Sequence, residues 1–161
     1  MTRNGNEILL VEDNPKDLKL AMHALNSNNL GNHIEVARDG EEALDYLFCR
    51  GQHAGRSFAE PPRVILLDLK LPKVDGLDVL RAVKGDPRTQ AIPVVIMTAS
   101  KEERDMVDGY RLGVNAYIQK PVDFDQFREI VKQIGLFWLV VNEPPPAAAF
   151  QTTPATAVQG K

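Results

Sequence analysis

The chain has 161 residues, a formal net charge of −3 and a hydrophobic content of 43%, which are ordinary values for one globular domain with its own core. This charge gives no electrostatic footprint for nucleic acid, and no apolar run approaches the ~20 residues that cross a bilayer. A single cysteine, Cys49, excludes an intrachain disulfide, and the polar N-terminus predicts no signal peptide. We therefore expect a cytoplasmic protein that binds neither nucleic acid nor membranes.

Five short segments predict β-strands, and three of them are apolar without alternation. Residues 7–11, 64–68 and 92–98 follow this pattern, which is typical of strands that are covered on both faces, as in a parallel sheet. Residues 33–37 alternate between polar and apolar positions, so we expect that strand nearer the edge of the sheet. Residues 116–119 predict a shorter fifth strand.

Between these strands, apolar residues recur at helical spacing. The first helix face has the i, i+3, i+4, i+7 pattern and consists of Leu18, Ala21, Met22 and Leu25. Asp13 or Asn14 could cap that helix, and Pro15 fits its first turn. Further helices are predicted within residues 43–48, 77–83, 101–113 and 123–141. Strand and helix alternate about five times, which predicts a doubly wound α/β fold with right-handed crossovers.

Two segments lack this periodicity. Residues 50–62 are rich in Gly, His, Ser and Pro and predict a long loop, of a length that is often functional or mobile. After Val141 the composition shifts to three consecutive prolines and a mixture of Ala, Thr and Gln. We therefore expect a folded domain over residues 1–142 and a disordered tail over residues 143–161.

Polar side chains follow the ends of four separate strands. Glu12 and Asp13 follow the first strand and Asp68 the third, while Thr98 ends the fourth and Lys120 follows the fifth. The C-terminal ends of parallel strands share one edge of the sheet, where open α/β folds keep their ligand sites. Each residue alone could be a cap, a turn residue or a surface charge, but their joint placement predicts one polar site.

The chemistry of this set is coherent. Three carboxylates in one pocket repel each other and need a counter-charge, which Mg²⁺ supplies with oxygen ligands. A carboxylate can also attack phosphorus to give an aspartyl-phosphate, and Asp68 on the central strand is the candidate for that role. Lys120 and Thr98 provide positive charge and a donor for phosphoryl oxygens. The Lys120–Pro121 bond is a candidate cis peptide, which would help to aim Lys120 into the site.

These motifs together resemble the receiver domains of two-component response regulators, over residues 7–134. The sequences that carry the resemblance are Val-Glu-Asp-Asn at 11–14, Leu-Leu-Asp-Leu-Lys-Leu-Pro at 66–72 with Asp75-Gly76, Met-Thr-Ala-Ser at 97–100 and Lys-Pro at 120–121. Within that family the chain is most similar to stand-alone regulators of phytochrome-type histidine kinases. This finer likeness rests on residues 11–15, 36–48, 121–123 and the Phe137-Trp138 ending.

The resemblance implies a flavodoxin-like (βα)5 fold with strand order 2-1-3-4-5. It implies that Asp68 accepts a phosphoryl group from a histidine of a sensor kinase. Glu12, Asp13 and Asp68 would hold Mg²⁺, with Mn²⁺ as an alternative, helped by the backbone carbonyl of Lys70. A histidine phosphotransfer protein is a further candidate partner.

The resemblance also assigns the phosphoryl-binding and switch residues. Thr98 and Lys120 would bind the phosphoryl group, and Thr98 together with Tyr117 would change position on activation. Lys70 and Ser100 lie two residues after Asp68 and Thr98, where the family varies and the lifetime of the phosphate is tuned. Tyr117 could equally be an ordinary half-buried strand residue.

The last predicted helix carries six consecutive apolar residues, 136–141. One helix face cannot bury all of them, so some must point away from the core and offer a surface to a partner. The resemblance implies a homodimer through this region, with Phe137, Trp138 and Val141 as contact residues. The alternative is that residues 137–141 fold back onto their own domain.

Other functions fit the sequence less well. A haloacid-dehalogenase-like phosphatase needs a second Asp two residues after its nucleophile, where this chain has Lys70, and it has no use for Glu12-Asp13. No glycine-rich nucleotide loop is present, and acids follow the first strand where a flavodoxin needs a hydroxyl-rich loop. A receiver that takes no phosphate and acts as an adaptor stays open. We expect no turnover enzyme, only self-catalysed phosphorylation and dephosphorylation.

Overall fold

The computed structural model describes residues 8–27, 33–121 and 123–150, and in this part of the chain five strands form one sheet. The strands are β1 (Ile8–Val11), β2 (Ile34–Ala37), β3 (Val64–Leu67), β4 (Val94–Thr98) and β5 (Ala116–Gln119). They lie in the order β2-β1-β3-β4-β5, and every neighbouring pair is parallel. This confirms the flavodoxin-like (βα)5 fold and its strand order.

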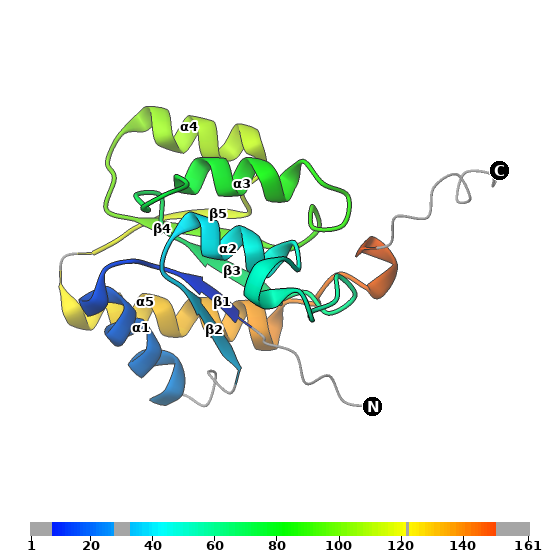
Figure 1. Cartoon of the computed structure of the whole chain (residues 1–161). Coiled ribbons are helices and arrows are strands. Elements are labelled where there is room, and N and C mark those ends of the chain that lie inside the picture. The colour runs from blue at the N-terminus through cyan, green and yellow to red at the C-terminus, as the bar shows by residue number, and fades with distance from the viewer. Residues whose placement is uncertain (1–7, 28–32, 122, 151–161) are drawn as a thin grey trace.

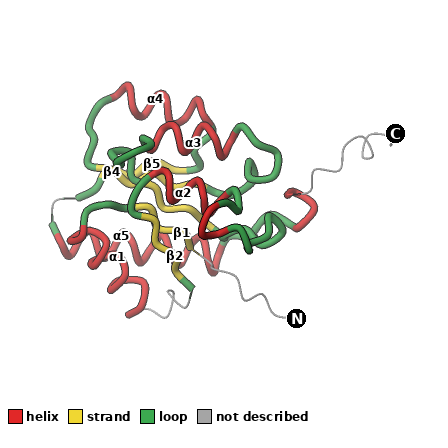
Figure 2. The backbone as a smooth tube through the Cα atoms, in the orientation of Figure 1, coloured by secondary structure: helices red, strands yellow, loops and turns green. Residues whose placement is uncertain are grey.

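Helices cover both faces of the sheet (Figure 1). One face carries α1 (Pro15–Ser27) and α5 (Phe124–Leu136), and the other carries α2 (Gly40–Leu47), α3 (Gly76–Lys84) and α4 (Glu103–Leu112). Figure 2 shows the strands as an inner layer between these two groups of helices. None of the helices in the described part of the chain has both the length and the apolar composition that a bilayer crossing requires.

The three inner strands are buried along their whole length. Every residue of β1, β3 and β4 is buried, whereas β2 buries only Ala37 and β5 buries none. Side chains that alternate along the inner strands feed two separate apolar cores, one below each group of helices. The pattern confirms that unbroken apolar runs mark doubly covered strands and that residues 33–37 form an edge strand.

Side chains cap the helices that flank the C-terminal edge of the sheet. Asn14 Oδ1 accepts hydrogen bonds from the backbone N–H groups of Lys16 at 2.9 Å and Asp17 at 3.2 Å, so Asn14 rather than Asp13 caps α1. Asp123 accepts in the same way from the first turn of α5. Because Asn14 takes the cap, the carboxylate of Asp13 is available to the strand-end site.

The loop at residues 50–62 is packed against α2 and the segment after α3. The Arg56 guanidinium lies 3.7 Å from the centroid of the Tyr46 ring and donates to the Tyr46 carbonyl. Phe58 in turn lies under the Arg88 guanidinium, 4.2 Å from the ring centroid. Both contacts are cation–π pairs that hold the loop to its neighbours.

The C-terminal segment differs from the expectation of a disordered tail from residue 143. A π-helical stretch (Phe137–Val141) extends α5, and a 3₁₀ turn (Ala147–Phe150) follows it. Phe150 is only 8% exposed and belongs to the core on the α2–α3–α4 side, and it lines a groove with Pro61 and Pro62. Phe150 is thus the buried contact of residues 143–150; residues 151–161 lie outside the described part.

Candidate phosphoacceptor and metal site

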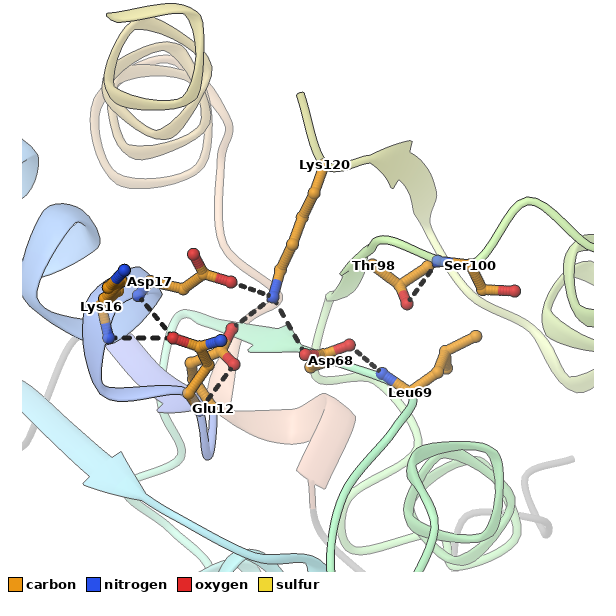
Figure 3. A network of polar contacts seen from close by, with 9 residues as sticks. Glu12, Lys16, Asp17, Asp68, Leu69, Thr98, Ser100 and Lys120 are labelled. Carbon is orange, nitrogen blue, oxygen red and sulfur yellow. Dashed lines mark hydrogen bonds and ion pairs between the residues drawn. The ribbon is translucent and has the colours of Figure 1, made fainter. Parts of the chain in front are cut away.

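Four strand ends bring the predicted polar residues to one place at the C-terminal edge of the sheet (Figure 3). Glu12 and Asp13 follow β1, Asp68 follows β3, Thr98 ends β4 and Lys120 follows β5. One carboxylate oxygen from each of the three acids lies within 4.8 Å of the others. The structure therefore brings together the acids that the sequence placed on separate strands.

Lys120 is the centre of this network. Its Nζ donates to Glu12 Oε1 at 2.8 Å, to Asp68 Oδ2 at 3.0 Å and to Asp17 Oδ2 at 2.8 Å. Figure 3 shows the three carboxylates converging on the ammonium from different elements. An ammonium has three N–H donors, so all of them are used on carboxylates.

Sequence reasoning did not predict Asp17, which lies in the first turn of α1. Its neighbour Leu18 belongs to the apolar stripe, and that periodicity says only that Asp17 is not in the centre of the buried face. The first turn of α1 follows β1 after a short connection, so it lies at the edge of the sheet that holds the site. A search for acids within one helical turn after Glu12-Asp13 would have found it.

The network is largely removed from water. Glu12 is 5% exposed and Asp68 is 8% exposed. Burial raises the pKa of Glu12 to about 7, because it outweighs the hydrogen bond and charge of Lys120, and the Asp68 charge acts in the same direction. For Lys120, burial lowers the pKa, but the hydrogen bonds to Asp17 and Glu12 and the charge of Asp68 outweigh it and raise the pKa above its usual range.

The two directions have different main causes. Several anions hold the proton on Lys120, whereas burial is the main reason that Glu12 keeps some affinity for a proton, and the Asp68 charge adds to it. Three carboxylates surround one ammonium, so negative charge exceeds positive charge at the centre of the site.

Backbone donors fix the two buried acids. The N–H of Leu69 donates to Asp68 Oδ1 at 2.7 Å, and the N–H of Asn14 donates to Glu12 Oε2 at 3.1 Å. Together with Lys120, these bonds give each oxygen of both carboxylates a donor. The main chain thus holds one oxygen of each carboxylate, while the other oxygen is held by the flexible side chain of Lys120.

The donor set fits a hard divalent cation. Glu12, Asp13 and Asp68 offer only carboxylate oxygens, which are the ligands that Mg²⁺ and Mn²⁺ take in proteins. Asp13 is exposed and leaves the site open on one side. Lys70 lies on the exposed stretch after Asp68, and ligation by its backbone carbonyl stays a prediction.

Thr98 lies across the site from Lys120 and is fully buried. Its Oγ1 accepts from the N–H of Ser100 at 3.2 Å, and Ser100 Oγ donates to Asp105 Oδ2 on α4 at 2.6 Å. Tyr117 is half-buried, with its ring centroid 6.4 Å from that of Tyr110. Burial first, and the charge of Asp105 second, raise the pKa of the Tyr117 phenol. The switch role of Thr98 and Tyr117 stays a prediction.

The expected cis peptide is wrong. The described chain contains no cis peptide bond, so Lys120–Pro121 is trans, the form that even an X-Pro bond prefers. Lys120 reaches the acids from the trans backbone, which the Lys120 N–H anchors by donating to the Thr98 carbonyl at 2.7 Å.

The predicted partner residues at the end of α5 do not behave alike. Phe137 is 47% exposed and Val141 is 65% exposed, whereas Trp138 packs against the core on the α1–α5 side. The two aromatic rings contact each other edge to face, with centroids 5.0 Å apart. Part of this segment thus folds back onto its own domain and part stays exposed.

Comparison with known proteins identifies the family and agrees with the fold. Residues 8–132 match the family model of the response regulator receiver domain. The chain belongs to this family. The receiver is 44% identical over 138 residues to the probable methanogenesis regulatory protein FilR2 of Methanothrix harundinacea, covering 86% of each chain. It is 37% identical over 132 residues to response regulator Rcp1 of Synechocystis, covering 82% of this chain and 88% of Rcp1.

Solved structures give the same family. The Mn²⁺-bound form of Rcp1 matches with a TM-score of 0.80 at 36% identity, over 86% of this chain and 98% of that one. The phosphorylated cyanobacterial phytochrome response regulator RcpA matches with a TM-score of 0.82 at 42% identity, over 88% and 99%. The bacteriophytochrome response regulator AtBRR is 53% identical over 87% and 99%, with a TM-score of 0.67. This receiver is therefore related to phytochrome response regulators.

Proposed function

We propose that Asp68 accepts a phosphoryl group from the phosphohistidine of a sensor kinase and that the receiver switches partners as a result. The observation that carries this proposal is the buried bridge from Lys120 to Asp68 and Glu12, at 3.0 and 2.8 Å. It holds a nucleophilic carboxylate beside a cation at a strand end that Thr98 also lines. The likeness to RcpA, whose structure is of a phosphorylated form, supports it.

The transfer forms one bond and breaks one. An oxygen of Asp68 attacks phosphorus, and the bond between phosphorus and the kinase imidazole breaks, so that its electron pair returns to the imidazole nitrogen. The Leu69 N–H keeps hold of Asp68 Oδ1 and fixes the plane of the carboxylate. Lys120 then donates to a phosphoryl oxygen instead of the carboxylate, and Thr98 Oγ1 supplies a second donor.

Glu12, Asp13 and Asp68 would hold the divalent cation, Mg²⁺ or Mn²⁺. When it is bound, the cation adds positive charge beside the phosphoryl oxygens and offsets the excess negative charge of the acids. The clustering of the three carboxylates within 4.8 Å supports this assignment, as does the Mn²⁺-bound form of the related Rcp1.

Phosphorylation would change the conformation of the loop after β4. The phosphoryl group carries roughly −2 charge in place of the single charge of the Asp68 carboxylate and brings three acceptor oxygens, which would draw the Thr98 hydroxyl inward and away from the Ser100 N–H. Ser100 is tied to Asp105 on α4, so the movement would reach α4 and the half-buried Tyr117. This face of the molecule is the proposed switch surface.

The proposed partners are a phytochrome-type histidine kinase and a second copy of this chain. The relationship to RcpA and AtBRR supports the kinase class. The exposed apolar side chains of Phe137, Val140 and Val141 support self-association at the end of α5. Trp138 would support this surface from behind rather than contact the partner.

The test combines a small phosphodonor with two readouts. Acetyl phosphate and Mg²⁺ are added to the full chain, and intact mass and sedimentation are measured together. We expect a Mg²⁺-dependent gain of one phosphoryl group, which is absent in Asp68→Asn and present in the control Asp125→Asn, an exposed acid that pairs with Arg128. A change in sedimentation would link phosphate to assembly.

The competing functions give different results. If Asp68→Asn still gained a phosphoryl group, Asp68 would not be the acceptor. If neither labelling nor a beryllofluoride complex formed in the wild type, the adaptor reading would replace the proposal. Turnover of an added phosphomonoester with release of phosphate would favour the phosphatase.

A further inference from the structure

We propose that Asp17 is a positioning residue for Lys120: it receives the ammonium when the divalent cation takes the carboxylates of Glu12 and Asp68. The inference rests on the proposed phosphoryl-transfer function and assigns a role to a residue outside the cation-binding acids. It starts from the division of the three carboxylates around Lys120 into two groups.

Two of the three partners of Lys120 belong to the cation cluster and one does not. Among the described residues, the acids that can share one cation are Glu12, Asp13 and Asp68. Asp17 is outside that set, although its Oδ2 is as close to Lys120 Nζ as the Glu12 oxygen, at 2.8 Å. Asp17 is thus the one anion that Lys120 can keep while the cluster is occupied.

Among the described residues, Lys120 is the side chain that donates to both Glu12 and Asp68, and a side chain can leave more easily than the main chain. The other donors to Glu12 and Asp68 are backbone N–H groups, those of Asn14 and Leu69. A divalent cation bound to these carboxylates would repel the ammonium at a distance of a few ångströms, because the side chains of Lys120, Glu12 and Asp68 are only 6 to 10% exposed. The long lysine side chain must therefore move away from the cluster.

The position of Asp17 suits it to receive the ammonium. It lies on the first turn of α1, where Asn14 Oδ1 accepts from its backbone N–H at 3.2 Å, so its main chain is held. Its side chain is 27% exposed, which makes its ionised form less costly than that of a buried acid. With Asp17 in place, Lys120 moves a short way without losing an anionic partner.

Removing this acceptor should weaken cation binding through Lys120. In Asp17→Asn, Lys120 keeps only Glu12 and Asp68 as anionic partners and competes with the cation for them. We expect the Mg²⁺ dissociation constant of the full chain to rise about three- to tenfold, the scale of one partly exposed ion pair. The readout is Mg²⁺ titration followed by backbone-amide NMR, with no phosphodonor present. Asp17→Glu should restore most of the affinity.

A double-mutant cycle separates this role from the general loss of a negative charge. If Asp17 acts through Lys120, Asp17→Asn has no effect on Mg²⁺ affinity in a Lys120→Met background. An effect of equal size in both backgrounds would show a field effect and overturn the proposal, as would unchanged affinity in Asp17→Asn alone. Asp125→Asn, an acid in the first turn of α5, controls for nonspecific charge and should leave the affinity unchanged.

Failure of this inference differs from failure of the proposed function. If the wild type binds no Mg²⁺ and takes no phosphoryl group from acetyl phosphate, the function itself is wrong. If it does both while Asp17→Asn titrates as the wild type does, only the role of Asp17 is wrong.

Discussion

Two partly buried lysines lie at opposite edges of the sheet, and they differ in what they bind. Lys120, at the C-terminal edge, donates to three carboxylates. Lys84, at the end of α3, donates to the carbonyls of Gln90 and Ile92 at 3.0 and 2.8 Å and to Asn115 Oδ1 at 3.3 Å. These acceptors are neutral, and they lie just before β4 and β5 at the N-terminal edge.

The pKa values of the two lysines shift in opposite directions. Burial lowers the pKa of Lys84 to about 8, whereas the surrounding anions raise the pKa of Lys120. Burial is similar in kind at both edges, so the partners decide the result. Lys84 holds loops together through neutral acceptors, whereas Lys120 neutralises part of the charge of a group of acids. Excess charge, rather than a buried lysine itself, distinguishes the functional edge.

The largest effect on the difference between the two lysines is expected when Lys120 is replaced by an uncharged residue. In Lys120→Met, two buried carboxylates lose their cation, and we expect the free energy of unfolding without metal to fall by about 3 kcal/mol. Added Mg²⁺ should recover most of this loss, because it replaces the missing positive charge. Urea denaturation with and without Mg²⁺ measures both effects. Equal stabilisation of wild type and variant by Mg²⁺ would contradict the explanation.

At the N-terminal edge of the sheet, we expect stability to depend on the packing of apolar side chains rather than on charge. Phe150 is buried beside Pro61 and Pro62, so Phe150→Ala should lower the free energy of unfolding by about 2 kcal/mol, less than in a central core because the site lies near the chain end. Urea denaturation checks this value. Mg²⁺ affinity serves as the internal control and should stay as in the wild type. A drop below 0.5 kcal/mol, on the order of a surface substitution, would argue that the segment is not docked.

The pKa of Glu12 predicts how cation binding depends on pH. Since that pKa is about 7, Glu12 is mostly protonated below pH 7, and a cation must displace the proton there. Mg²⁺ should bind about tenfold more weakly at pH 6 than at pH 8 because the ionised fraction changes by that factor. Calorimetric titration at both pH values measures it. Glu12→Gln should bind weakly at both values and lose this slope; an unchanged slope would assign the proton to another group.

The smallest effect is expected at Lys84. In Lys84→Met, the carbonyls of Gln90 and Ile92 and the Asn115 side chain lose a donor, but water reaches this edge and no charge is left unpaired. The free energy of unfolding should fall by about 1 kcal/mol, with Mg²⁺ affinity and phosphoryl uptake unchanged. Chemical denaturation and intact mass after acetyl phosphate test both statements. A loss of phosphoryl uptake would show that the two edges are coupled.

The sequence predicted those features that depend on short-range pattern and on parallel topology. Unbroken apolar runs predicted the buried strands, and a shared edge for parallel strands placed Asp68, Thr98 and Lys120 together. Asp17 was missed because it does not directly follow a strand. It lies in the first turn of α1, and helical periodicity alone does not show that its side chain points toward Lys120.

Residues 143–150 differ from the expected disorder for another reason. Their prolines and alanines give a composition typical of disorder, but composition averages over residues, and one aromatic, Phe150, decides whether the segment docks. Phe150 lines a groove together with Ala59, Pro61 and Pro62, which are far away in sequence. The prediction of a cis Lys120–Pro121 bond was also wrong. The Lys120 side chain is long enough to reach Glu12 and Asp68 from a trans backbone.

Asn14 joins the site to a helix. Its N–H donates to Glu12 Oε2, and its side chain accepts from the first N–H groups of α1. Any ligand that holds the Glu12 carboxylate therefore also steadies the start of α1, and removing the ligand should let that turn fray. Hydrogen–deuterium exchange at the backbone amides of Lys16 and Asp17 would then report occupancy of the site, and the first turn of α1 would carry the same information to a partner that contacts it.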